Sequence, residues 1–355
     1  MTGSRSYPTD IKSVHIELTD KCQAACPMCA RNYSGGAVRP FIKNSEISFE
    51  DFKKWFPVTF LSNLNNFYSC GNYGDPVFAT DCLEIYDYVR QANPTARLGI
   101  HTNGSLRKPV WWKKLASVLG DNGEVIFAID GFKGKHELYR RNTSFDKIIE
   151  NMVAFIQAGG TARVDSLIFA HNEHDVEELE KFLLGLGVKS VNFKATTRFY
   201  SLPEFEVLNK DNIKEYSLYP ATKIEFVKKP NATLEKFLDK DFLQNFVDTA
   251  VITPKCISKK ELYIDPHGNV LPCCYVGSDF LEIPLEERMV LHTLRNLTVE
   301  NSKQMLSKIT VPNLKDNDVE VILSNDQLWN DIYEFWDGKN KCLTCIKNCS
   351  TSVYD

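Results

Sequence analysis

The feature that most constrains the fold is a repeated alternation between short apolar runs and longer amphipathic runs. The short runs predict β-strands because they are rich in β-branched and aromatic residues and are bounded by polar turns. We expect strands at 14–18, 66–70, 97–101, 124–129, 163–169 and 190–195. We expect helices between them at 49–61, 81–91, 109–118, 145–158 and 176–186.

This alternation favours an α/β fold in which helices cover a parallel sheet. The six strand–helix units of this sequence are too few to close an eight-stranded barrel. The sequence therefore predicts a partial (β/α)6 TIM-like barrel that is open on one side. A doubly wound open sheet is the competing architecture. In barrels the chemistry sits at the carboxyl ends of the strands, so motifs that follow the predicted strands are candidate site residues.

Three cysteines follow the first predicted strand, Cys22, Cys26 and Cys29, with the spacing C-x3-C-x2-C. Three thiolates on one short loop can bind three irons of a cubane iron–sulfur cluster. Clusters that only transfer electrons take four cysteines, so this loop would leave one iron open to another ligand. A zinc site or a set of unconnected thiols is the alternative, although zinc loops favour C-x2–4-C pairs with two further ligands later in the chain.

This spacing directly after a first strand resembles that of the radical S-adenosylmethionine (SAM) enzymes. The resemblance implies that the open iron of a [4Fe-4S] cluster chelates the amino and carboxylate groups of SAM. It also implies that the reduced cluster cleaves SAM to a 5′-deoxyadenosyl radical, which abstracts a hydrogen atom from a substrate. The family usually has an aromatic residue just before the third cysteine, and this chain has Met28 at that position near the cofactor.

The second predicted strand runs into Gly71-Asn-Tyr-Gly74-Asp75-Pro76. The two glycines permit backbone geometry that side chains would block, and Asp75 could pair with a ligand ammonium group. The stretch resembles the glycine-glycine-glutamate-proline motif that holds the SAM amino group, with Gly74, Asp75 and Pro76 on its last three positions. Aspartate is one methylene shorter than the glutamate of that motif. A plain turn is the alternative.

Polar residues also follow the third and fourth predicted strands. Thr102 and Asn103 offer a hydroxyl and an amide group, and the resemblance implies that they contact the SAM ribose or carboxylate; an Asn-Gly turn is the alternative. Asp130 falls where the family often has an aspartate near SAM. Either Arg140 or Arg141 matches the arginine that reaches the SAM carboxylate, and the sequence leaves open which of the two does so.

The segment 198–255 lacks the strand–helix period, and we interpret it as a linker with one or two crossover helices, such as 233–247. A second group of cysteines begins directly after this segment. The order C-x11-G-x4-C, followed much later by C-x2-C, resembles the auxiliary-cluster region called SPASM or its shorter twitch form. We therefore expect a partial barrel at 1–197 and an auxiliary-cluster domain at 256–355, with a hairpin between 262 and 271.

The resemblance implies one auxiliary [4Fe-4S] cluster in this domain. The four expected ligands are Cys256, Cys273, Cys342 and Cys345. Cys274 and Cys349 remain, and either could replace one of the four. Four cysteines suit a structural zinc ion as well.

Cys70 lies at the end of the second predicted strand, beside the expected SAM site. A thiol there could return a hydrogen atom to a substrate radical, as in radical epimerases. The alternative is that Cys70 is a small buried hydrophobic residue.

The composition limits partners and compartment. A formal net charge of −4 gives no basic field for nucleic acid, and no apolar run is long enough to span a membrane. Eleven cysteines without an apolar signal segment favour a reducing, cytoplasmic location over a disulfide framework. Only about twenty residues precede the cysteine loop, which leaves no room for a leader-peptide-binding domain and favours a small molecule, or a peptide presented by a separate protein.

Together these features predict a radical SAM enzyme of the oxidoreductase or maturase type. The resemblance implies that flavodoxin or ferredoxin supplies the electron, and that an auxiliary cluster assists net oxidation or bond formation on a small-molecule or peptide substrate. A radical peptide epimerase that uses a cysteine as hydrogen donor is one alternative. A non-catalytic iron–sulfur or zinc redox sensor is another.

Overall fold

The structure is a computed structural model of the 355-residue chain, and it describes residues 9–196, 198–199, 202–227, 240–280, 293–337 and 341–350. The chain divides into two compact units. The larger unit contains Ile16–Phe49 and Asn66–Lys229. The smaller unit contains Met1–His15, Glu50–Asn65 and Pro230–Asp355.

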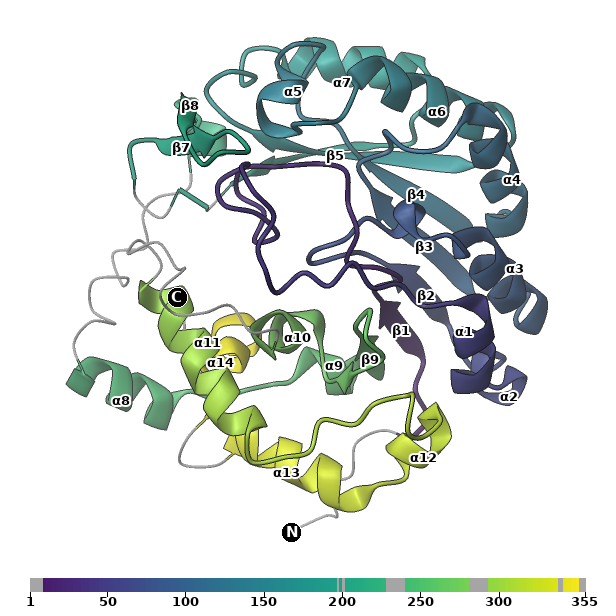
Figure 1. The fold of residues 1–355 in the computed structure, drawn as a ribbon, viewed down its shortest axis with the longest axis vertical. Helices are drawn as coiled ribbons and strands as arrows, with labels where there is room; N and C mark the ends of the chain where they lie inside the picture. Colours follow the sequence, from purple (N-terminus) through teal and green to yellow (C-terminus); the bar gives the residue numbers. More distant parts are fainter. Residues whose placement is uncertain are drawn as a thin grey trace. The chain divides into compact units, whose positions relative to one another are not determined.

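A parallel sheet forms the centre of the larger unit (Figure 1). Its strands lie in the chain order β1–β2–β3–β4–β5–β6, and parallel registers join each neighbouring pair from β2 to β6. The bounds are β1 Ser13–Ile16, β2 Asn66–Ser69, β3 Arg97–Thr102, β4 Gly123–Ala128, β5 Thr161–Ile168 and β6 Val191–Ala195. The predicted α/β architecture with a partial barrel is confirmed.

Helices between the strands line the outer side of this sheet (Figure 1). They are α3 Cys82–Ala92, α4 Pro109–Leu119, α5 His136–Tyr139, α6 Phe145–Gln157 and α7 Val176–Gly185, with short 3-10 turns η1 Pro76–Phe78 and η2 Ile224–Phe226. Aromatic side chains fill the contact between α4, α6 and the sheet, where the ring of Trp112 lies 5.2 Å from that of Phe127 and 6.4 Å from that of Phe155. All three rings are fully buried, so apolar packing fixes these helices on the sheet.

The opposite face of the sheet carries several paired charged side chains. Glu124 on β4 pairs with Arg97 on β3 at 2.5 Å and with Arg163 on β5 at 2.9 Å. Further along β5, Asp165 pairs with Lys194 on β6 at 2.6 Å. Alternation along each strand produces this division, because successive side chains point to opposite faces.

The structure differs from the sequence prediction in the segment after β6. A two-stranded antiparallel hairpin, β7 (Phe205–Leu208) and β8 (Lys214–Leu218), lies where only crossover helices were expected. Each strand is short, and β8 carries two charged residues, so neither has the apolar run that marks a strand. Of the helix expected at 233–247, the structure describes α8, Lys240–Thr249, whereas 233–239 lies outside the described residues.

The smaller unit consists mainly of short helices. They are α1 Phe49–Trp55, α2 Val58–Leu61, α8, α9 Lys255–Ser258, α10 Cys274–Phe280, α11 Thr293–Leu306, α12 Val319–Leu323, α13 Asp326–Asp337 and α14 Leu343–Cys349. The single helix expected at 49–61 is wrong, because it breaks at Pro57, which is extended (φ −64°, ψ 153°) and caps α2. The predicted hairpin is confirmed as β9 (Glu261–Ile264) and β10 (Val270–Leu271).

No helix within the described ranges is both long enough and apolar enough to cross a lipid bilayer.

Candidate functional site

The cysteine loop follows β1; Cys26 is buried, whereas Cys22 and Cys29 are partly buried. Burial raises the pKa of Cys22 well above the ordinary thiol value, and the charges of Asp75, Cys26 and Cys29 raise it further. Burial also raises the pKa of Cys26 to about 11, against the opposing effect of Arg140. The three thiols therefore lie within electrostatic reach of one another.

An apolar shell surrounds this loop. Cys26 belongs to a buried cluster with Tyr139, Phe169 and Phe199, and with hairpin residues that include Val207. The rings of Tyr139 and Phe169 lie 4.7 Å apart, and those of Phe169 and Phe199 lie 6.0 Å apart. This packing limits the access of water to the thiols. Within the described ranges, no three His, Cys, Asp or Glu side chains are grouped as a metal site, so the ligand set of this loop stays a prediction.

The glycines after β2 are required by close backbone packing. A Cβ atom on Gly74 would lie 1.8 Å from the Thr19 carbonyl oxygen, and one on Gly71 would lie 2.1 Å from the Gly74 carbonyl oxygen. Both distances are impossible for a real side chain. The Asp75 amide also donates to the Lys21 carbonyl at 2.9 Å. The predicted glycine motif therefore lies directly against the backbone that leads into Cys22.

Asp75 joins the ends of β2 and β3. Its carboxylate accepts hydrogen bonds from the Thr102 hydroxyl at 2.8 Å, from the Asn103 amide N–H at 2.7 Å and from the Asn103 side chain. It also accepts from the Val77 amide at 3.2 Å, at the start of the 3-10 turn that Pro76 opens. Asp75 is 5% exposed, and burial raises its pKa. The structure thus brings the predicted residues Asp75, Thr102 and Asn103 together.

Asn103 connects this group to the cysteine loop. Its side-chain nitrogen lies 3.8 Å from the Cys22 sulfur, and its side-chain oxygen accepts from the Gln23 amide at 2.7 Å. The sequence analysis did not identify Gln23, because no motif marks it.

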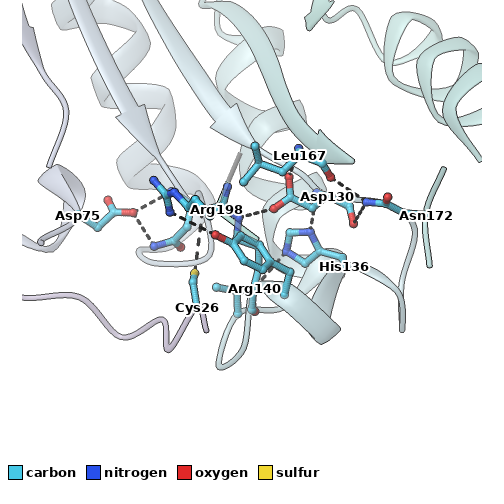
Figure 2. A network of polar contacts seen from close by, with 11 residues as sticks. Cys26, Asp75, Asp130, His136, Arg140, Leu167, Asn172 and Arg198 are labelled. Carbon is cyan, nitrogen blue, oxygen red and sulfur yellow. Dashed lines mark hydrogen bonds and ion pairs between the residues drawn. The ribbon is translucent and has the colours of Figure 1, made fainter. Parts of the chain in front are cut away.

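Asp130 and Arg140 form a buried ion pair at the carboxyl end of β4. Arg140 Nε lies 2.6 Å from Asp130 Oδ2, and Asp130 is fully buried (Figure 2). The Leu167 amide donates to the other carboxylate oxygen at 2.6 Å. Arg140 Nη1 lies 4.0 Å from the sulfur of Cys26. Burial lowers the pKa of Arg140, but Asp130 and Cys26 raise it by more, so the guanidinium stays charged beside the cysteine loop.

The Arg141 guanidinium points toward the β7–β8 hairpin rather than toward a cysteine sulfur. Its guanidinium donates to the Leu208 carbonyl, to the Gly35 carbonyl at 3.3 Å, and to Glu215 at 2.5 Å. These contacts tie the β7–β8 hairpin to the segment after the cysteines. The Arg141 carbonyl accepts from the Ala25 amide at 3.0 Å, but of the two arginines that the sequence left as alternatives, Arg140 is the one whose guanidinium reaches a cysteine of the loop.

Met28 and Arg198 lie on the aromatic side of the loop. Met28 packs against the buried cluster, and its carbonyl accepts from Arg198 Nη1 at 3.1 Å. The same Nη1 lies 3.4 Å from the Tyr139 hydroxyl. Arg198 follows β6 and was not predicted, because it belongs to no recognisable motif.

Cys70 lies directly after β2 and is partly buried. Burial raises the pKa of its thiol to about 12, and the charges of Glu17, Asp75 and Asp165 contribute in the same direction. The side chain therefore remains a protonated thiol at neutral pH, near the carboxylate that organises the strand ends.

The smaller unit gathers the second group of cysteines. Burial raises the pKa of Cys256 and of Cys273, and the charge of Cys349 raises both further. On α14, Cys345 and Cys349 are four residues apart and share a helix face, while Cys342 caps the helix. Cys273 and Cys342 both raise the pKa of Cys345. Cys349 therefore lies within electrostatic reach of Cys256 and Cys273, two of the four residues predicted as ligands.

Two polar contacts reach sulfur atoms of this second group. The Trp336 indole nitrogen donates to the Cys345 sulfur at 3.4 Å, and the Ser302 hydroxyl lies 3.6 Å from the Cys342 sulfur.

Comparisons with known proteins agree with this geometry. A sequence profile described as the radical SAM superfamily matches residues 16–183. The fold is similar to that of SuiB from Streptococcus suis bound to S-adenosylmethionine, with a TM-score of 0.54, 15% identity, and 93% of this chain and 68% of that chain covered. SuiB bound to its precursor peptide SuiA gives a TM-score of 0.52 and 14% identity, with 92% and 67% covered.

The structure of hexahistidine-tagged anSMEcpe with bound AdoMet gives a TM-score of 0.50 and 18% identity, with 84% of this chain and 83% of that chain covered. At these identities the structural likenesses support the fold, whereas the sequence profile covers the cysteine loop and every strand end described above up to β5. This match identifies residues 16–183 of the chain as a radical SAM superfamily domain.

Proposed function

We propose that the protein cleaves SAM reductively to a 5′-deoxyadenosyl radical, which then abstracts a hydrogen atom from a substrate. The observation that carries this proposal is the convergence of two polar groups on the cysteine loop. Asn103, held by Asp75, lies 3.8 Å from Cys22, and Arg140, held by Asp130, lies 4.0 Å from Cys26. Asn103 follows β3, and Arg140 is paired with Asp130, which follows β4, so both contacts depend on strand ends, where barrel enzymes carry their chemistry.

The donor set fits an iron–sulfur cluster. Three cysteine thiols lie in an apolar shell with a fixed cation beside one of them, and thiolates with such surroundings suit iron–sulfur ligation. A [4Fe-4S] cluster on Cys22, Cys26 and Cys29 would supply the electron for SAM cleavage, through an iron without a protein ligand.

The chain's own residues would bind and orient SAM. Arg140 uses Nε for Asp130 and directs Nη1 toward Cys26, so its remaining N–H groups suit the SAM carboxylate. The Asp75 carboxylate suits the SAM ammonium group, and Thr102 and Asn103 suit its carboxylate or ribose hydroxyls. Tyr139, Phe169 and Phe199 would keep water from the radical.

We also propose an auxiliary [4Fe-4S] cluster in the smaller unit. The proposed ligands are Cys256, Cys273, Cys342 and Cys345. Cys349 lies close enough to affect the pKa of Cys256 and of Cys273, so it remains a candidate to replace one of the four. In this proposal residues 256–355 form an SPASM or twitch domain that accepts an electron during net oxidation or bond formation, and flavodoxin or ferredoxin supplies the first electron.

The substrate proposed is a peptide or a small molecule. SuiB, which shares the fold, has a structure with a bound precursor peptide, and this supports the peptide class. A second candidate, peptide epimerisation, is favoured by Cys70, because burial keeps it a thiol beside the site and a thiol can donate a hydrogen atom. In that case a Cys70→Ser variant would still cleave SAM but would no longer place solvent deuterium on the product α-carbon.

Anaerobic reconstitution with iron, sulfide, SAM and dithionite tests the main proposal. We expect 5′-deoxyadenosine from the wild type and none above background from Cys26→Ala. Wild-type protein with its iron sites filled that releases no 5′-deoxyadenosine would contradict the proposal and would favour a non-catalytic redox sensor.

A further inference from the structure

His136 lies beside the proposed SAM site, and its ring bonds to a backbone amide and to a hydroxyl group. It opens α5, is fully buried, and comes from the loop that follows Asp130. Its Nδ1 accepts a hydrogen bond from the Asp130 amide at 3.1 Å, and its Nε2 lies 3.0 Å from the Thr143 hydroxyl (Figure 2).

These two contacts define the protonation state of the ring. Nδ1 accepts from a backbone N–H and therefore carries no proton, so the neutral ring bears its proton on Nε2. Nε2–H then donates to Thr143. Burial lowers the pKa of His136 to about 4, which agrees with a neutral ring at physiological pH.

The chain of hydrogen bonds returns to Arg140. The Thr143 hydroxyl accepts from His136 and donates to the Arg140 carbonyl at 2.5 Å, while the Thr143 amide donates to the same carbonyl at 3.2 Å. The Arg140 amide in turn donates to the His136 carbonyl at 2.9 Å. The ion pair between Arg140 and Asp130 closes this ring of contacts.

Arg140 needs this support because it lies where the helix ends. Its backbone is not helical (φ −87°, ψ 59°), and Asn142 two residues later has a positive φ of 61°. Asp130 has anchors besides His136, since its carbonyl accepts from the Asn172 side chain at 3.1 Å and its carboxylate accepts from the Leu167 amide. One end of the ion pair is therefore anchored by β5 and the loop that follows it, and the other by Thr143 and His136.

We propose that His136 and Thr143 are positioning residues for SAM binding, which act by fixing the Arg140 guanidinium between Asp130 and Cys26. This inference rests on the proposed SAM-binding role of Arg140. The ligand class is the α-carboxylate of SAM, which a fixed guanidinium binds with a smaller loss of side-chain freedom than a mobile one.

Removing the Thr143 hydroxyl tests the inference with little change of shape. We expect Thr143→Val to weaken SAM binding to the reconstituted protein about tenfold, since the hydrogen bonds of the hydroxyl to His136 and to the Arg140 carbonyl are both lost. The KM for SAM in 5′-deoxyadenosine formation should rise by the same factor, while kcat at saturating SAM changes little. Thr143→Ser, which keeps the hydroxyl, should restore wild-type binding.

Thr95→Val is the matched control. The Thr95 hydroxyl also donates a hydrogen bond, to Asn93 at 3.0 Å, but it lies before β3 at the other end of the strand from the site. We expect this variant to bind SAM like the wild type. His136→Phe, which keeps a ring but loses both nitrogens, should weaken SAM binding at least as much as Thr143→Val.

Three outcomes separate the possibilities. Folded Thr143→Val and His136→Phe that bind SAM within twofold of the wild type would overturn the inference. Wild-type protein with a filled cluster that does not bind SAM would overturn the proposed function, and with it the inference. If either variant fails to fold, a crystal structure of Thr143→Ser gives a second test, because this variant keeps the hydroxyl. An Arg140 side chain displaced from Asp130 and Cys26 in that structure would contradict the positioning role.

Discussion

At the scale of single residues, the packing of Gly74 is the most restrictive feature of the site. Its hypothetical Cβ falls 1.8 Å from a backbone oxygen of Thr19, and backbone cannot move aside as a flexible side chain can. We expect Gly74→Ala to lower the free energy of unfolding by more than about 3 kcal/mol, as severe overpacking does. Urea denaturation measures this change.

Gly185 provides the matched control for that substitution. It ends α7, and a Cβ there would meet no atom within 4 Å. Gly185→Ala should be neutral or should stabilise by up to about 1 kcal/mol, because alanine favours helix. Equal unfolding free energies for the two variants would show that the close approach at Gly74 does not exist.

The buried His136 predicts a pH dependence of stability. Its pKa in the folded chain is about 4, below the ordinary value of 6.5, so between these values the unfolded state binds a proton that the folded state does not. The contribution of His136 to the free energy of unfolding is fully present above about pH 6.5. It is lost as the pH falls toward about 4, and the total loss is at most about 3 kcal/mol. Subtracting the pH profile of His136→Phe from that of the wild type isolates the effect, and a difference that does not vary with pH would contradict it.

The sequence was sufficient to predict side chains that come together because they follow neighbouring strands. Asp75, Thr102 and Asn103 follow predicted strands, and parallel pairing brings their side chains together. Gln23 and Arg198 escaped prediction because only tertiary packing brings them to the cysteine loop. The choice between Arg140 and Arg141 needed the structure for the same reason.

At the scale of elements, the β7–β8 hairpin is the addition that the sequence did not predict. It packs on the cysteine loop through Phe205, Val207 and Leu218, and the Leu208 amide donates to the Ser34 carbonyl at 2.9 Å. The strands of the sheet were predictable because each has a clear apolar run, whereas the hairpin strands are short and charged.

Arg141 is expected to hold this hairpin in place. Arg141→Ala removes its contacts to Leu208, Gly35 and Glu215, and a hydrogen bond to a charged group contributes about 1.5–3 kcal/mol. Hydrogen exchange at 205–218 should then accelerate by about tenfold or more.

The control for this experiment is Arg163→Ala, which breaks an ion pair with Glu124 in the sheet and leaves the hairpin contacts intact. It should not change exchange at 205–218. Unchanged exchange in the Arg141 variant would mean that apolar packing alone holds the hairpin.

At the scale of the whole molecule, two cysteine groups in two compact units predict two clusters. The reconstituted wild type should bind about eight irons and the double variant Cys256→Ala, Cys273→Ala about four, because each cubane cluster holds four. Iron and sulfide analysis with a zinc assay measures both. A wild type with about four irons and one zinc would assign the second group to a structural zinc ion instead.

The central claim is that SAM binds an iron without a protein ligand, next to Cys22, Cys26 and Cys29. Electron–nuclear double resonance on the reduced cluster tests it most directly, with SAM isotopically labelled at its amino nitrogen and carboxylate oxygen. We expect strong coupling of both labelled atoms to the cluster in the wild type, and much weaker coupling of the carboxylate oxygen in Arg140→Ala. Absence of coupling in the wild type, with the cluster filled and SAM saturating, would contradict the claim.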